Sequence, residues 1–223
     1  MARLSLGSLA LGALLMLTLH FVPPTDEMDP VRRTLSQYAL SPNKWIFDLS
    51  VLLVAIGSAL VFLELTRRRL VRPLSAPVLL GAVWTASLLI IVAFTKTNWA
   101  VGPGTGGVVH RYASLTAFVS LPLAVIMVAG AAFPHATGWR WAARGLGGLS
   151  LGWFTLIMIG VVNMYAGDGR PWWRFVPLGL VERLVVTTAV AAIAVVVLGL
   201  VLASPQWTQK PPGRSPETPA PVP

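Results

Sequence analysis

Cysteine is absent from the 223-residue sequence, and charged residues make up only 11% of it. The missing cysteine excludes disulfides, thiolate metal sites, cysteine nucleophiles and covalently attached c-type haem. A soluble domain carries about 25% charged residues, so this share is less than half the usual one. With 55% hydrophobic residues, a single soluble core could not bury the apolar surface. The composition therefore predicts a membrane protein.

Acidic residues are also scarce, because eight Asp and Glu stand against 17 Lys and Arg, a formal net charge of +9. In a soluble chain this balance would suggest nucleic acid as the partner. Here the mean hydropathy of +0.73 makes the lipid bilayer the predicted partner, and we expect no nucleic-acid binding.

Six apolar segments are each close to the roughly 20 residues that a helix needs to cross about 30 Å of hydrocarbon. They lack the period-2 alternation of barrel strands. The sequence predicts an all-α fold, an integral membrane bundle of six transmembrane helices within one domain, residues 1–203. The predicted spans are residues 4–22, 45–65, 76–95, 109–132, 146–166 and 178–203. The first span is longer than a signal-peptide core and lacks a small-residue cleavage site, so we expect it to be retained.

Residues 204–223 contain seven prolines and predict a disordered tail. Before the tail, the short connections carry the Lys and Arg residues that report orientation. The densest group is Arg67, Arg68, Arg69 and Arg72. Nine bases fall on its side against seven on the other when Lys210 and Arg214 of the tail are included, and without the tail the two sides are equal. This bias predicts a protein of the cell membrane with both termini in the cytoplasm.

Glycine and other small residues form two pairs at helical spacing, Ser8 with Gly12 and Gly148 with Gly152. Such pairs permit close contact between helices. A third glycine-rich run, residues 102–107, lacks the Gly-Lys-Ser/Thr ending of a phosphate loop and follows no strand. We expect it to be an outer turn.

The scarce acids gather on one side of the predicted bundle. Six of the eight carboxylates fall on the face that also holds His20 and His110. Ionisable residues within a span usually face the bundle interior and have a partner. One interpretation is an outward-facing polar site, with Asp48 and Glu182 as carboxylates, His110 as base or ligand and Arg183 as an anion clamp. The other is a salt-bridge network that fixes helix register.

The histidines show no His-x-x-x-His or His-Glu-x-x-His spacing, so we predict no metal site. A haem would need a histidine pair at matched depth on facing helices, which the positions of His20 and His110 do not favour. The sequence indicates no other cofactor.

Four short motifs resemble, in order and spacing, a bacterial membrane family called domain of unknown function 998 (DUF998). They are Asp29-Pro30 with Ser36-Gln37-Tyr38, Val109-His110-Arg111, Trp139-Arg140, and Gly179-Leu180-Val181-Glu182-Arg183. The resemblance implies a six-helix integral membrane protein and singles out Asp29, Ser36, His110, Glu182 and Arg183. It implies no substrate.

The sequence leaves four functions open. The first is an outward-facing polar site for a lipid headgroup or small polar ligand, lined by Asp29, Ser36, Asp48, His110, Glu182 and Arg183. The others are a small transporter or channel, a structural or accessory protein, and a membrane-embedded hydrolase that uses Ser36 with His110 and a carboxylate. The depth of the polar residues discriminates among them: a cluster near the rim favours binding or hydrolysis, and one at the midplane favours transport.

Overall fold

The computed structural model describes residues 1–98, 100–102, 104–166 and 176–202, and within these ranges the chain is helical without strands. The predicted tail, 204–223, lies outside them. The described residues form six α-helices and two short 3-10 helices. These are α1 (Ala2–Thr18), η1 (Thr25–Glu27), η2 (Leu35–Leu40), α2 (Lys44–Arg67), α3 (Ala76–Ala93), α4 (Thr105–Ala132), α5 (Thr137–Ala166) and α6 (Leu178–Leu202).

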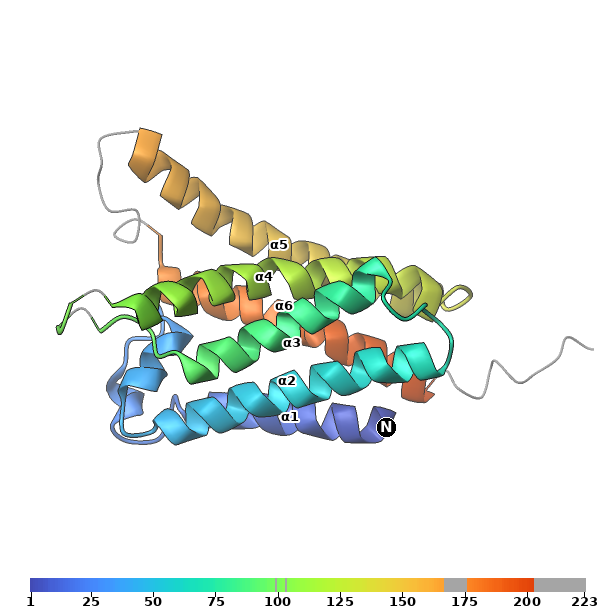
Figure 1. The fold of residues 1–223 in the computed structure, drawn as a ribbon, viewed down its shortest axis with the longest axis horizontal. Helices are drawn as coiled ribbons and strands as arrows, with labels where there is room; N and C mark the ends of the chain where they lie inside the picture. Colours follow the sequence, from blue (N-terminus) through green and yellow to red (C-terminus); the bar gives the residue numbers. More distant parts are fainter. Residues whose placement is uncertain (99, 103, 167–175, 203–223) are drawn as a thin grey trace, which may run out of the picture.

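Successive helices run up and down beside one another, which gives the bundle two ends (Figure 1). The loop end contains residues 19–43, residues 94–104 and the first turns of α4 and α6. The arginine end contains residues 67–75 and 133–144, together with Met1 and the last turn of α6. Helices α2 to α6 are long and apolar enough to cross a membrane, and α1 is a shorter apolar helix. The chain is therefore an all-helical, multi-pass membrane bundle.

Three helix boundaries differ from the predicted spans by four residues or more, namely the end of α1 and the beginnings of α4 and α5. Helix α1 ends at Thr18, four residues before the predicted end, because the chain turns ahead of Pro23 and Pro24. Helix α5 begins at Thr137, nine residues before the predicted span. Its first turns carry Arg140 and Trp141, which are too polar for a hydropathy segment but suit a helix at the membrane interface.

Helix α4 begins within the glycine-rich run, which is therefore only partly a turn. Gly104 is the N-cap and Gly107 lies in the first turn of the helix. A side chain at Gly107 would collide with the backbone and side chain of Thr97. Glycine thus lets residues 95–98 pass directly against α4.

Helices α1 and α2 pack closely through small polar residues. An added Cβ on Gly12 would meet the Ser50 carbonyl oxygen at 2.9 Å, and the Ser50 hydroxyl donates to the Gly12 carbonyl at 2.7 Å. The Ser8 hydroxyl donates to the Leu53 carbonyl. By contrast, nothing within the described chain lies within 4 Å of an added Cβ on Gly148 or Gly152.

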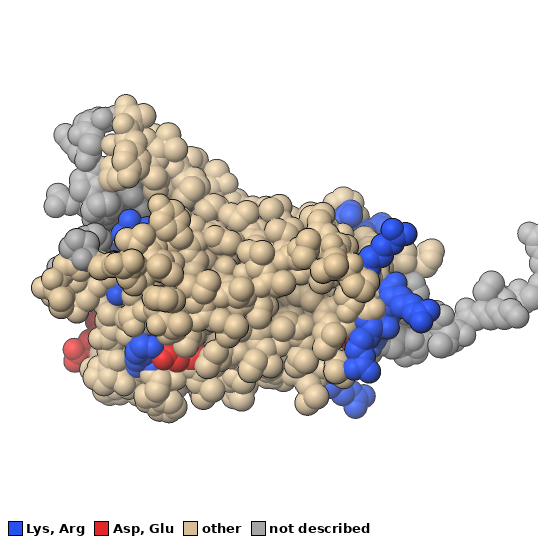
Figure 2. All heavy atoms as spheres, in the orientation of Figure 1, with Lys and Arg blue, Asp and Glu red and all other residues tan. Residues whose placement is uncertain are grey.

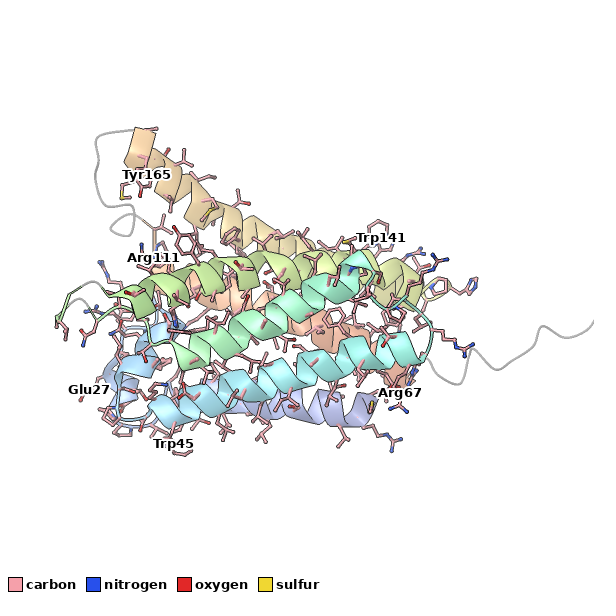
Figure 3. All side chains as sticks on the ribbon, viewed as in Figure 1. Glu27, Trp45, Arg67, Arg111, Trp141 and Tyr165 are labelled. Carbon is pink, nitrogen blue, oxygen red and sulfur yellow. The ribbon has the colours of Figure 1, made fainter. Side chains whose placement is uncertain are left out.

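Helix α5 leaves the bundle toward its C-terminal end, and Tyr165 lies at the outlying tip (Figures 1 and 3). Its sequence stays apolar there, with Ile159, Val162 and Tyr165 exposed. Since hydrocarbon solvates apolar side chains, exposed positions of this kind suit a lipid-facing helix. The first half of α5 remains packed against α4 and α6, where Ala143, Gly147 and Ser150 are buried.

The contact between α1 and α2 leaves no room for a larger residue at Gly12. We expect Gly12→Leu to lower the free energy of unfolding by about 1–3 kcal/mol through overpacking. Thermal unfolding in detergent measures the change. Gly148→Leu is the control, since its added atoms meet open space. Equal melting temperatures for the two variants would contradict the described packing.

Candidate functional site

The first turn of α6 lies directly on the backbone of the first long loop. An added Cβ on Gly179 would collide with the Arg33 carbonyl and would lie 2.7 Å from the Pro30 carbonyl oxygen. The next residue, Leu180, donates its backbone N–H to the Val31 carbonyl at 3.0 Å. Only glycine permits this approach, which brings the following residues, Glu182 and Arg183, against the loop.

Arg183 holds the loop through hydrogen bonds to backbone carbonyls. Its Nη1 donates to the carbonyls of Pro30 and Arg33 at 2.8 and 2.7 Å, and also to that of Gly179. Its Nη2 donates to the Tyr38 hydroxyl at 3.1 Å. Most of the guanidinium donors are therefore occupied by this chain, so Arg183 organises the loop.

His20 accepts a hydrogen bond from the Nε atom of the Arg183 guanidinium. Arg183 Nε donates to His20 Nε2 at 3.0 Å. The other ring nitrogen, Nδ1, lies 3.2 Å from the carbonyls of Met16 and Leu17 at the end of α1. This arrangement requires the tautomer with the proton on Nδ1, and it ties the end of α1 to α6.

Glu182 caps the short helix η2. Its buried carboxylate accepts hydrogen bonds from the backbone N–H groups of Leu35 and Ser36. These are the first N–H groups of η2, which have no partner within that helix. Glu182 and Arg183 thus hold the same loop from adjacent positions on α6, one through N–H groups and the other through carbonyls.

Asp29 and Asp48 are placed differently from the other predicted site residues. Asp29 is half exposed and folds its own loop, since its Oδ1 accepts from the backbone N–H groups of Val31 and Arg32. Asp48 pairs with Lys44 one turn earlier on α2. Neither carboxylate lines the cavity that lies between the helices.

His110 is buried near the beginning of α4, with 4% of its surface exposed. Its Nδ1 donates to the Phe94 carbonyl at 2.7 Å, which leaves Nε2 as an acceptor. That Nε2 atom is buried and has no hydrogen-bond partner among the described residues. An unsatisfied buried acceptor costs about 1–3 kcal/mol. Asp48 Oδ1 is also buried without a partner among the described residues, but of the two residues only His110 lines the cavity.

Three further polar side chains form a chain of hydrogen bonds at the loop end. Lys96 Nζ lies 2.6 Å from Thr34 Oγ1, and Thr34 Oγ1 lies 3.1 Å from Ser36 Oγ. Burial lowers the pKa of Lys96 from its ordinary value, and the charge of Arg33 lowers it further, whereas the carboxylate of Glu182 opposes both. The amine of Lys96 is thus shifted toward its neutral form.

A cavity of about 600 Å³ runs down from this polar cluster. Ser36, His110, Glu182 and Arg183 line it at the loop end, together with His20. Deeper in the bundle its walls are mostly apolar and come from five helices. They include Leu6, Leu9, Ala10, Ala13 and Met16 of α1, Val51 and Val54 of α2, Trp84 and Leu88 of α3, Ala117 and Phe118 of α4, and Val186, Val190, Ala191 and Ala194 of α6.

The structure thus brings together four of the six predicted site residues, Ser36, His110, Glu182 and Arg183. It adds Thr34 and Lys96, which the sequence-based set omits. Lys96 follows the third predicted span, on the same face as His110, and this position was the available signal. Within the described ranges, no three His, Asp or Glu side chains gather as a metal site.

A sequence profile described as a protein of unknown function (DUF998) matches residues 7–199. The chain belongs to this family. No curated protein and no solved structure matches the chain. In this DUF998 protein the motif residues Gly179, Glu182 and Arg183 hold the first loop against α6, and Asp29 folds that loop.

In this DUF998 protein, Arg183→Lys should release the loop, because lysine keeps the charge but cannot bind several acceptors in one plane. Hydrogen bonds to charged groups contribute roughly 1.5–3 kcal/mol each. We expect faster amide hydrogen exchange across residues 28–40 and a lower melting temperature. Arg111→Lys, at an exposed position of the same end, is the control. Wild-type exchange rates in Arg183→Lys would refute the role of the guanidinium.

Proposed function

We propose that this membrane protein binds an amphiphile, with its apolar chain in the cavity and its polar group at the loop end. The observation that carries the proposal is the distribution of polarity along one cavity of about 600 Å³. That volume lies within the range of roughly 300–1,000 Å³ for small-molecule sites. A ligand that is polar at one end and apolar along the rest matches this distribution.

The length of the cavity supports a long-chain ligand. Its lining on α6 extends from Glu182 to Ala194, which at 1.5 Å per residue corresponds to about 18 Å. The hydrocarbon core of a bilayer is about 30 Å thick, so a ligand at the loop end would reach past the middle of the membrane. A small polar molecule would leave most of this length unfilled.

The depth of the polar residues favours binding over transport. His110 and Glu182 lie within about 8 Å of the first residues of their helices, at 1.5 Å per residue. A transport path would place charged residues near the midplane. In the middle turns of the six described helices the sequence has no Asp, Glu, Lys or Arg.

A purely structural role accounts for Arg183 and Asp29, because their partners lie within the loop. It does not account for His110, whose Nε2 is buried without a partner among the described residues. This acceptor supports a ligand whose polar group donates a hydrogen bond, such as a hydroxyl. We infer that the ligand's hydroxyl comes within reach of His110 through a small movement of the surrounding side chains.

We also propose that the arginine end faces the cytoplasm of a cell membrane, which leaves the loop end outside. Lys and Arg gather at the arginine end, and the visible acids lie at the other (Figure 2). The exposed bases there are Arg3, Arg67, Arg68, Arg69 and Arg72. Cytoplasmic loops carry an excess of Lys and Arg, which supports this orientation.

Filling the cavity should prevent binding. The probe is tritium-labelled hexadecanol, added to the protein in phosphatidylcholine nanodiscs. We expect Ala191→Phe to weaken its binding at least about 10-fold, which corresponds to about 1.4 kcal/mol. Ala86→Phe is the matched control, since Ala86 is exposed on α3 and outside the cavity lining. Equal binding by the two variants would count against the proposal.

The orientation has a separate test. Green fluorescent protein fused after Pro223 should fluoresce, and alkaline phosphatase inserted after Pro42 should be active. These reporters function on the cytoplasmic and outer sides respectively. The reverse result would invert the proposed orientation without affecting the cavity.

A further inference from the structure

Many serine and threonine hydroxyls of the described residues donate to backbone carbonyls. Ser5, Ser50 and Ser150, for example, donate to the carbonyls of Ala2, Gly12 and Val185. Such bonds satisfy the hydroxyl proton inside a membrane bundle and place no basic group beside the hydroxyl.

Ser36 and Thr34 differ from these hydroxyls, because within the described chain they bond to each other and to Lys96. The distances are 3.1 Å from Ser36 Oγ to Thr34 Oγ1 and 2.6 Å from Thr34 Oγ1 to Lys96 Nζ. Ser36 alone of the three lines the cavity. The hydroxyl that a ligand can reach is therefore connected to an amine through one intervening hydroxyl.

We propose that Ser36, Thr34 and Lys96 form a nucleophilic relay that hydrolyses the ester bond of an amphiphile whose acyl chain lies in the cavity. This inference rests on the proposed function, since it gives the bound amphiphile a reaction. Ser36 is the nucleophile, Thr34 passes the proton, and Lys96 is the base. Serine and lysine form such sets on unrelated folds.

The reaction proceeds in two balanced steps. Ser36 Oγ adds to the ester carbonyl carbon while its proton passes to Thr34 Oγ1, and the Thr34 hydroxyl proton passes to neutral Lys96 Nζ. The tetrahedral adduct then breaks its bond to the alcohol oxygen, which leaves with the proton returned from Lys96 through Thr34. Water attacks acyl-Ser36 by the same proton path, and this releases the carboxylic acid and restores Ser36.

The surroundings of Lys96 suit a base. Its charge interacts with those of Glu182 on α6 and Arg33 of the first loop, and with His110 on α4. Burial and Arg33 favour the neutral amine, so its pKa is lowered despite the carboxylate of Glu182. Lysine acts as a base when its environment lowers its pKa in this way. Arg183 brings a permanent positive charge to the same end of the cavity, where the oxyanion would develop.

Within the described residues Ser36 Oγ is hydrogen-bonded to Thr34 and not to His110, whose Nδ1 bonds to the Phe94 carbonyl. The relay therefore replaces a Ser–His arrangement, and it leaves His110 to receive a hydrogen bond from the amphiphile.

The test uses a short-chain alkyl fluorophosphonate, which reacts with activated serines and does not need to fill the cavity. We expect wild-type protein to be labelled at Ser36, as located by peptide mass spectrometry. Ser36→Ala should lose the label, whereas Ser41→Ala should keep it. Ser41 is the matched control because it follows the same short helix and donates to the Tyr38 carbonyl. Folded wild-type protein without label at Ser36 would overturn the proposal.

The role of Lys96 is tested with Lys96→Arg, which keeps a positive charge beside Glu182 but cannot release a proton. General bases contribute about 10²–10⁴-fold, so we expect labelling to slow at least about 100-fold. In the wild type the labelling rate should rise with pH, with a midpoint below 10.5, the ordinary pKa of lysine. A role in charge alone predicts wild-type rates in Lys96→Arg, and that result would overturn the relay.

Thr34 provides a rescue experiment. Thr34→Val should slow labelling as much as Lys96→Arg does, and Thr34→Ser should restore it because the hydroxyl remains. Hexadecanol binding by Ser36→Ala separates the two proposals. If hexadecanol binds normally but the wild-type protein is not labelled at Ser36, the amphiphile site is retained and the relay is rejected. If Ser36 is labelled but hexadecanol does not bind, the reactive serine is retained and the amphiphile site is rejected.

Discussion

The contact between the guanidinium of Arg183 and the carbonyls of the first loop holds the loop end together. The loop would otherwise present backbone groups without partners beside a nonpolar bundle, where each costs several kcal/mol. Arg183 satisfies carbonyls of this loop, and Glu182 satisfies the N–H groups of Leu35 and Ser36. Because both residues lie on α6, one helix fixes the loop from which Thr34 and Ser36 extend. The proposed site therefore depends on a contact that is itself structural.

This dependence explains why the scarce acids, with His20 and His110, concentrate at the loop end of the bundle. Some of them organise backbone, as Asp29 does, and others border the cavity, as Glu182 and His110 do. The motif Gly179-Leu180-Val181-Glu182-Arg183 thus combines the two purposes within a turn and a half of helix. Gly179 allows the close approach of α6 to the loop. Glu182 binds backbone N–H groups of the loop, and Arg183 binds its carbonyls. Both residues also line the loop end of the cavity.

Much of the fold follows from the sequence, because apolar segments of the right length define membrane helices almost alone. The sequence also predicts that Ser36, His110, Glu182 and Arg183 lie at the same end of the bundle, because the order of the helices determines at which end each loop and helix terminus lies. Side-chain direction does not follow so simply. Asp48 lies between Phe47 and Ser50, which line the cavity, yet it points toward Lys44 on the same helix instead. Helical positions turn by about 100° per residue, so depth alone could not separate them.

The contact of Lys96 with Thr34 could not be read from the sequence, because both residues lie in irregular segments without a periodic pattern. They are separated by 62 positions in the chain. Their meeting depends on Gly107, which lets residues 95–98 pass against α4, and on Gly179, which seats the first loop on α6. Both glycines can be noticed in the sequence, but the segment that packs against each of them is known only from the folded structure.

The shortness of α1 has a consequence for the surrounding lipid. Its 17 residues span about 26 Å at 1.5 Å per residue, less than the hydrocarbon thickness of about 30 Å. A bilayer adapts to a short helix by thinning beside it. Since α1 also forms a wall of the cavity, thinning beside this helix would bring lipid headgroups closer to the cavity.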